Sequence, residues 1–132
     1  YVFVPLPCVS PGSRVRLSGD GPSSWSVLMT VSRPRTKEFA RWGTLPGAYI
    51  YTNGTQDKTI TGGKPLDMMR AIVRDYSKPG DTICDPCAGA GTTLLAAVME
   101  GRKAIGAEID PVTWEHACQR VRKSYQLPLI AE

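Results

Sequence analysis

The sequence predicts an α/β fold in which parallel strands alternate with helices in three layers. Three observations in the second half indicate it: two short strand-like runs, a glycine-rich turn after the first run, and helical spacing of apolar residues around them. A strand–helix–strand order of this kind forms a right-handed crossover unit of a parallel sheet. Because this half supplies two such strands, we expect the sheet to be incomplete.

The first half, residues 1–62, is predicted to be a basic, loop-rich region. Gly and Pro at residues 18–22 and through residues 43–61 disfavour regular structure there. Loops of this length in a compact domain are commonly functional. Short β-type runs predict three strands, at Tyr1–Val4, Ser26–Val31 and Tyr49–Thr52.

The second half, residues 63–132, is predicted to form a separate subdomain of alternating helices and strands. Pro65 suits a first helical position, and apolar residues follow it with helical spacing. Gly101 is placed to end a later helix. The predicted elements are a helix at 65–76, a strand at Thr82–Asp85, a helix at Thr92–Glu100, a buried strand at Lys103–Glu108 and a helix at Pro111–Tyr125.

Length and composition favour one compact domain of 132 residues with a core, since 42% of the residues are hydrophobic. No stretch approaches the roughly 18 continuous apolar residues of a membrane span, and no secretory signal is recognisable. We therefore expect a cytoplasmic protein with no membrane partner. Because the chain opens on Tyr1 with a strand-like run, we also expect an upstream portion.

Positive charge is concentrated in the first half. Up to residue 62 there are seven Lys and Arg against three Asp and Glu, and from residue 63 there are nine against nine. A segment that faces a polyanion shows this asymmetry, and so does an ordinary basic surface. The excess lies at Arg14, Arg16, Arg33, Arg35, Lys37, Arg41 and Lys58.

The segment Asp85-Pro86-Cys87-Ala88-Gly89-Ala90-Gly91-Thr92-Thr93 is the most informative part of the chain. It follows a strand and opens a helix. Gly89 permits a tight turn, and Gly91 lets a ligand approach the backbone. The helix that begins near Thr92 directs free N–H groups and its positive dipole end toward that ligand. The segment therefore predicts a nucleotide-type site.

Glu108 supports that interpretation, because it ends the next strand about 20 residues after the glycines. At this position nucleotide-binding strand–helix–strand units carry a carboxylate that accepts hydrogen bonds from the ribose hydroxyls. A phosphate-binding P-loop would need a lysine after Gly91, and Thr92 stands there. A nicotinamide or flavin site would favour a third glycine, where this chain has Leu94. S-adenosylmethionine has no pyrophosphate, and Asp85 is placed to attract its positive charge.

These motifs resemble those of the amino-group DNA methyltransferases, whose cofactor motif is usually D-P-F-x-G-S-G-T-T. Gly62-Gly63-Lys64-Pro65-Leu66 is similar to the family's Lys-Pro helix start, and residues 101–110 are similar to its G-R-x-x-I-G-x-E segment. The order is the permuted one, with these motifs C-terminal, as in phage and bacterial members. The resemblance is specific over residues 63–121. It implies a Rossmann-like S-adenosylmethionine-dependent methyltransferase fold acting on adenine N6 or cytosine N4 in double-stranded DNA, as in restriction-modification systems.

The resemblance also implies a set of cofactor-binding residues. Lys64 and Pro65 would line the methionine end, Glu108 would hold the ribose, and Ile109 would cover one adenine face. Cys87 departs from the family, which usually has an aromatic residue there, so packing against the cofactor would be reduced. The floor and the helix start would comprise Asp85, Pro86, Cys87, Ala88, Gly89, Gly91, Thr92 and Thr93.

The family's catalytic loop, [DSN]-P-P-[YFW], is not found in this sequence. Residues 9–12, Val-Ser-Pro-Gly, come nearest but lack the second proline and the aromatic residue. In the permuted order this loop would precede Tyr1, so the catalytic residues stay unassigned. Two alternatives remain open: a non-catalytic nucleotide- or DNA-binding remnant, and a methyltransferase for RNA or a small molecule.

Other candidate residues have structural interpretations. Cys84-x-x-Cys87 could suggest zinc, but His116 and Cys118 point to different helix faces, so no metal is expected and Cys84 is predicted to be buried in its strand. The four cysteines are too few and uneven for a disulfide scaffold. Trp25 and Trp42 could stack on bases or pack in the core. The sequence does not indicate an oligomeric state.

Overall fold

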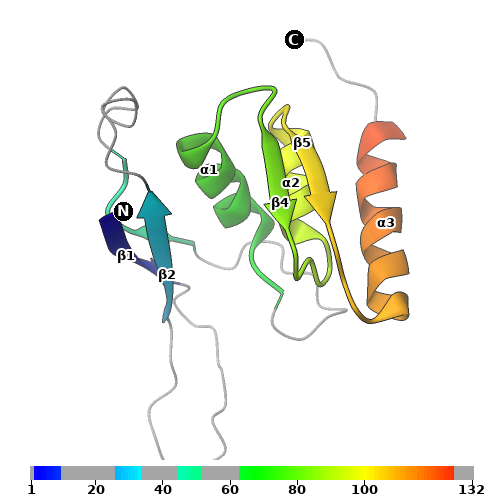
Figure 1. Cartoon of the computed structure of the whole chain (residues 1–132), viewed down its shortest axis with the longest axis horizontal. Coiled ribbons are helices and arrows are strands. Elements are labelled where there is room, and N and C mark those ends of the chain that lie inside the picture. The colour runs from blue at the N-terminus through cyan, green and yellow to red at the C-terminus, as the bar shows by residue number, and fades with distance from the viewer. Residues whose placement is uncertain (1, 10–25, 34–44, 52–62, 127–132) are drawn as a thin grey trace, which may run out of the picture. The chain divides into compact units, whose positions relative to one another are not determined.

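A computed structural model describes residues 2–9, 26–33, 45–51 and 63–126 of the chain (Figure 1). The chain divides into two compact units, Tyr1–Gly54 and Thr55–Glu132. The predicted boundary after residue 62 falls at the edge of a segment outside the described residues. Among the described residues, no helix is long and apolar enough to cross a lipid bilayer.

The first unit contains a three-stranded sheet with the order β2-β1-β3. β1 pairs with β2 in antiparallel fashion along its whole length, and with β3 in parallel only at Cys8 and Val9. Pro5 and Pro7 occupy alternate positions of β1 and therefore remove N–H donors from one edge of the strand. The strands are β1 (Val2–Val9), β2 (Ser26–Arg33) and β3 (Tyr49–Ile50). The first two are longer than predicted, and the third is shorter.

The second unit has the predicted order of elements. The two strands pair in parallel, from Thr82 with Lys103 to Asp85 with Gly106. Pro65 is the N-cap of α1 rather than its first residue, and its carbonyl accepts a hydrogen bond from the Met69 N–H. The elements are α1 (Leu66–Tyr76), β4 (Thr82–Asp85), α2 (Thr92–Met99), β5 (Lys103–Gly106) and α3 (Pro111–Gln126).

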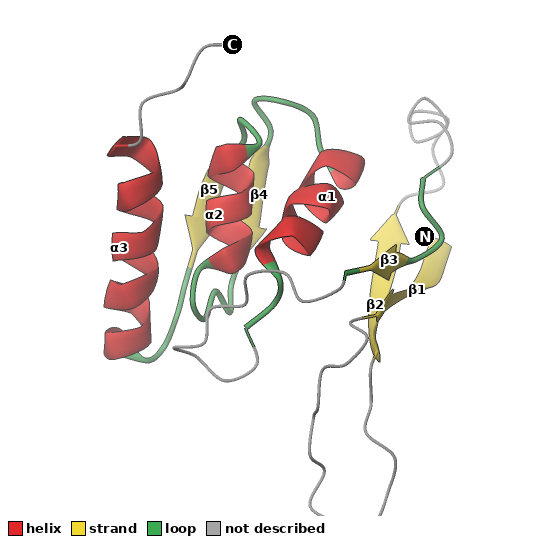
Figure 2. Ribbon diagram, turned by 180° about the vertical axis from the view of Figure 1, so that it is seen from behind, coloured by secondary structure: helices red, strands yellow, loops and turns green. Residues whose placement is uncertain are grey.

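The core of this unit is built around α2, which lies across the two strands with α1 and α3 beside it (Figure 2). Ala96 and Ala97 of α2 are both 0% exposed, because α2 meets other elements on several sides. A helix that is apolar all round is expected in such a position. Gly101 has a φ of 73° and ends α2, as predicted, in the left-handed conformation that glycine adopts readily.

Two predictions about burial are wrong: that the strand at Lys103–Glu108 is buried, and that Cys84 is buried. Exposure alternates along each strand, and the exposed positions include Cys84 of β4 and Ile105 of β5, which is 60% exposed. The reason is that the described helices of this unit cover one face of the two strands (Figure 2). A sheet covered on one face alternates between covered and exposed side chains, whereas a sheet covered on both faces does not.

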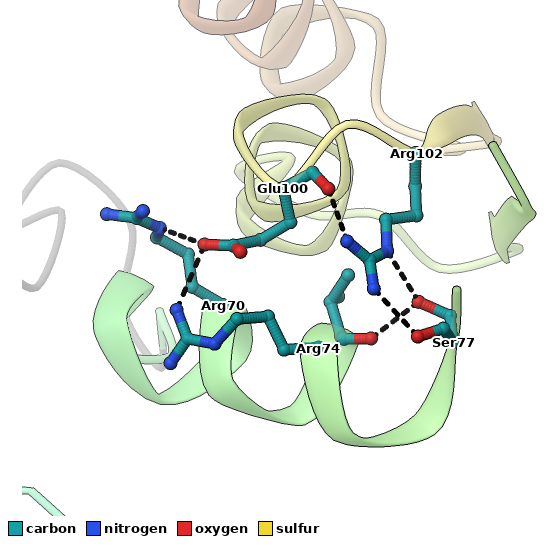
Figure 3. A network of polar contacts seen from close by, with 6 residues as sticks. Arg70, Arg74, Ser77, Glu100 and Arg102 are labelled. Atoms are coloured by element: carbon teal, nitrogen blue, oxygen red, sulfur yellow. Dashed lines mark hydrogen bonds and ion pairs between the residues drawn. The ribbon is translucent and has the colours of Figure 1, made fainter. Parts of the chain in front are cut away.

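A polar network joins the C-terminal ends of α1 and α2 (Figure 3). Arg102 donates hydrogen bonds to the Glu100 carbonyl, to the Ser77 hydroxyl at 2.9 Å and to the Ser77 carbonyl at 2.7 Å. Arg70 and Arg74 donate to the Glu100 carboxylate at 2.7 and 3.2 Å. The Glu100 side chain is 10% exposed, so these pairs satisfy a largely buried charge. The network therefore fixes α1 against the turn between α2 and β5.

We predict that Arg102→Met destabilises the chain by about 2–3 kcal/mol, because it leaves the Ser77 and Glu100 carbonyls without a charged donor. Urea unfolding followed by circular dichroism measures the change. Arg122→Met on the exposed surface of α3 is the matched control and should leave the midpoint almost unchanged. Equal midpoints for the two variants would contradict the role given to the network.

Candidate functional site

The candidate site lies where β4 and β5 end and α2 begins. Residues 86–91 form the turn between β4 and α2, called the glycine turn below, and Glu108 follows the end of β5. Gly89 and Gly91 have φ values of 50° and 72°, in the left-handed region that side chains disfavour. Figures 1 and 2 place the N-terminal ends of α1 and α2 at this same end of the unit. The glycine positions predicted from the sequence are therefore required by backbone geometry.

Most N–H groups of this turn donate hydrogen bonds to acceptors within the protein. Cys87 donates to the Asp85 carboxylate at 3.1 Å, and Ala88 donates to the Ala107 carbonyl at 2.8 Å. Gly89 donates to Oε2 of Glu108 at 2.8 Å, and Gly91 donates to the Ala88 carbonyl at 2.8 Å. Donors used in this way are not available to a bound phosphate. The turn therefore offers few free N–H groups to an anionic ligand.

Glu108 joins the glycine turn to the start of α3. Its Oε1 accepts the Asp110 N–H at 3.1 Å while its Oε2 accepts the Gly89 N–H. These hydrogen bonds, that from Asp110 first, lower the pKa of Glu108 from its ordinary value, so the carboxylate is ionised at neutral pH. Hydrogen bonds from Thr113 lower the pKa of Asp110, which caps α3 by accepting the Thr113 N–H at 2.7 Å.

Helix α3 contacts the glycine turn through Ala117 and Arg120. A Cβ on Gly91 would lie 2.9 Å from the Cβ of Ala117. Arg120 donates to the Ala90 carbonyl, and to the Thr92 hydroxyl at 3.3 Å. Sequence reasoning missed both α3 residues, because Ala117 lies 26 positions after Gly91 and Arg120 lies 30 after Ala90, and no local motif marks them.

The structure places the predicted site residues in different environments. Asp85, Cys87, Gly89 and Glu108 come together through the hydrogen bonds above. The predicted residues Lys64, Pro86, Cys87 and Ile109 are exposed, whereas Pro65, Ala88, Gly91 and Thr92 are buried. Ile109 is 98% exposed, so its apolar side chain is accessible to a ligand beside Glu108. The Thr92 hydroxyl accepts a hydrogen bond from Arg120 of α3, and Thr93 is half-buried.

Several other sequence predictions concern residues that the structure does not describe. These include both first-half tryptophans, the Ser-Pro-Gly of residues 10–12 and all the first-half basic residues except Arg33, which belongs to β2. Within the described ranges, no group of three or more His, Cys, Asp or Glu is arranged to hold a metal ion.

Comparison with known protein families identifies the chain. The model of the N6/N4 DNA methylase family matches residues 24–119, well over half of the sequence. The chain belongs to this family. The match includes β2, the glycine turn, Glu108 and Ala117 of α3, and it ends one residue before Arg120. The resemblance inferred from the motifs is confirmed.

Curated relatives are similar to the chain over shorter stretches. The type II methyltransferase M.MthZI of Methanothermobacter thermautotrophicus is 33% identical over 69 residues, which is 52% of this chain and 19% of the relative. The DNA adenine methyltransferase YhdJ of Escherichia coli is 45% identical over 47 residues, 36% of this chain and 16% of the relative. The chain therefore spans a small part of the length of these relatives.

A solved structure supports the fold. A DNA modification methylase of Thermus thermophilus, TTHA0409, in complex with S-adenosylmethionine, is 26% identical with a TM-score of 0.58; the match covers 90% of this chain and 52% of that one. The predicted Rossmann-like methyltransferase fold is confirmed, and the chain spans about half the length of this neighbour.

We predict that Gly91→Ala destabilises the chain by about 2 kcal/mol, because the added methyl combines a disfavoured φ with overpacking against Ala117. Gly89→Ala is the matched control: its φ is also positive, but nothing lies within 4 Å of the added Cβ. Thermal unfolding should show the larger loss for Gly91→Ala. Equal losses would mean that α3 does not restrict the turn.

We predict that Glu108 makes stability depend on pH. Because its folded pKa lies below the ordinary value of 4.5, its contribution is present above about pH 4.5 and is lost as the pH falls through the folded pKa. The difference in unfolding free energy between the natural chain and Glu108→Gln should therefore be larger at neutral pH than in acid. A difference independent of pH would show that the ionised carboxylate does not stabilise the turn.

Proposed function

We propose that this chain provides the S-adenosylmethionine-binding part of an enzyme that transfers a methyl group to the exocyclic amine of adenine or cytosine in DNA. The observation that carries the proposal is the position of the Glu108 carboxylate, which is ionised and hydrogen-bonded to the glycine turn at Gly89. The family to which the chain belongs supports the same function.

The chemistry of the site fits this cofactor. Each Glu108 oxygen accepts one backbone N–H, so each retains a lone pair that can accept a ribose hydroxyl. The negative charge beside a turn in which most N–H groups already donate within the protein disfavours a pyrophosphate. The adjacent Ile109 side chain, almost fully exposed, offers an apolar surface to a flat adenine ring. A nucleoside without phosphate and with a positive charge suits this combination.

The residues that would hold the cofactor are those predicted from the sequence. Glu108 would bind the ribose, Ile109 would cover the adenine, and Asp85 would face the positively charged end together with Lys64 and Pro65 at the start of α1. When bound, S-adenosylmethionine supplies a methyl group activated by its sulfonium charge. The protein's own task in this part is to orient the cofactor and to keep the turn in one conformation.

The DNA-facing part of the proposal depends on the first half of the chain. Its excess of seven basic over three acidic residues suits contact with the phosphates of double-stranded DNA. A target base must leave the helix for an amine to reach the methyl group, at a cost of a few kcal/mol. The residues that would receive the base are not assigned. Action on DNA would also agree with the cytoplasmic location predicted from the sequence.

We predict that the 132-residue chain binds S-adenosylmethionine but not NAD in calorimetric titration. Glu108→Ala should weaken binding about tenfold or more, because a charge-assisted hydrogen bond to the ribose is lost. Glu115→Ala, which removes an exposed carboxylate from α3, is the matched control and should bind as the natural chain does. Equal binding of both cofactors, or no binding by a folded chain, would contradict the proposal.

The two exposed cysteines provide a second test. Cys87 belongs to the glycine turn, whereas Cys84 lies on the open face of the two-stranded sheet. S-adenosylmethionine should slow the alkylation of Cys87 by iodoacetamide and leave Cys84 unchanged, as measured by mass spectrometry with site assignment. Protection of both thiols to the same extent, or of Cys84 alone, would place the ligand elsewhere.

A further inference from the structure

The peptide group between Ala90 and Gly91 is held at both of its polar atoms. Its carbonyl, on Ala90, accepts a hydrogen bond from Arg120 of α3, and its N–H, on Gly91, donates to the Ala88 carbonyl at 2.8 Å. The hydrogen bond between Gly91 and Ala88 is internal to the turn. The hydrogen bond from Arg120 comes from a residue 30 positions further along the chain. Arg120 therefore restrains this peptide group from outside the turn.

Such a restraint matters here because Gly91 has little conformational preference of its own. Glycine adopts positive and negative φ almost equally, so the peptide before Gly91 can rotate with little steric resistance from that residue. Rotation would turn the Ala90 carbonyl toward the other side of the turn and break the Gly91–Ala88 hydrogen bond. The Arg120 guanidinium opposes that rotation, since the carbonyl of the buried Ala90 would lose its charged donor.

The location of this cation also needs an explanation beyond general stability. Arg120 contacts the hydroxyl of Thr92, the first residue of α2, at 3.3 Å. The N-terminal end of a helix carries partial positive charge and disfavours a nearby cation. A neutral donor would satisfy the Ala90 carbonyl without that repulsion. The guanidinium instead reaches two acceptors at once, one in the turn and one in the helix that follows it.

We propose that Arg120 is a positioning residue: it holds the Ala90–Gly91 peptide in one orientation and so keeps the glycine turn in the conformation that binds the cofactor. The inference rests on the proposed function for the identity of the ligand, but not for the restraint itself. Ala117 contributes to the same restraint from one turn earlier on α3, because it leaves no room for a side chain at position 91.

The test compares Arg120→Gln, Arg120→Lys and the control Arg122→Gln, which removes the same charge from an exposed position of α3. Amide hydrogen exchange, measured by NMR without ligand, reports on the restraint. Exchange of the Gly91 N–H should accelerate about tenfold in Arg120→Gln, while the amides of β4 and β5 keep their rates. Arg120→Lys should restore slow exchange, because an ammonium group can still donate to the Ala90 carbonyl.

Calorimetry with S-adenosylmethionine gives the second measurement. Affinity should fall about five- to tenfold in Arg120→Gln, return to within about twofold in Arg120→Lys and stay unchanged in Arg122→Gln. Natural exchange at Gly91 in Arg120→Gln would overturn the inference. Faster exchange throughout β4 and β5 would overturn it too, because Arg120 would then act on global stability. If exchange responds as expected but the natural chain does not bind S-adenosylmethionine, the restraint stands and the proposed function fails.

Discussion

The hydrogen bond from the Gly89 N–H to the Glu108 carboxylate, at 2.8 Å, is the interaction on which the candidate site depends. It joins the turn after β4 to the segment after β5, two stretches that no local sequence preference would bring together. With it, the turn has a fixed shape and the carboxylate a fixed position. Because Cys87, Ala88 and Gly91 also donate their N–H groups inside the protein, few donors of the turn remain for an anionic ligand.

The two ends of the second unit are specialised in different ways. At one end, Arg102 and Glu100 bind the C-terminal ends of α1 and α2 through charged hydrogen bonds (Figure 3). At the other end, the glycine turn keeps exposed surface beside Glu108 and Ile109. Rigid attachment at the first end fixes the direction of α1, and therefore the position of Pro65 at its start. The network therefore supports the candidate site from the opposite end of the unit.

The sequence predicted the parts of this structure that local chemistry determines. Thr82–Asp85 was placed correctly because a strand directly before a glycine turn has a distinct pattern, and Gly101 because a left-handed helix end favours glycine. The exposure of Cys84 was not predictable, since it depends on which face of the sheet the helices cover. Arg120 was missed for a related reason: its role depends on the packing of α3 against the turn, which no spacing rule describes.

The central claim is that the turn and Glu108 together bind a nucleoside cofactor that carries no phosphate. Titration of the ¹⁵N-labelled chain, followed by the amide resonances of Gly89 and Ile109, tests it most directly. S-adenosylmethionine should shift both resonances in a saturable manner, and NAD should shift neither. Unchanged Gly89 and Ile109 resonances with S-adenosylmethionine, or equal shifts with NAD, would contradict the account.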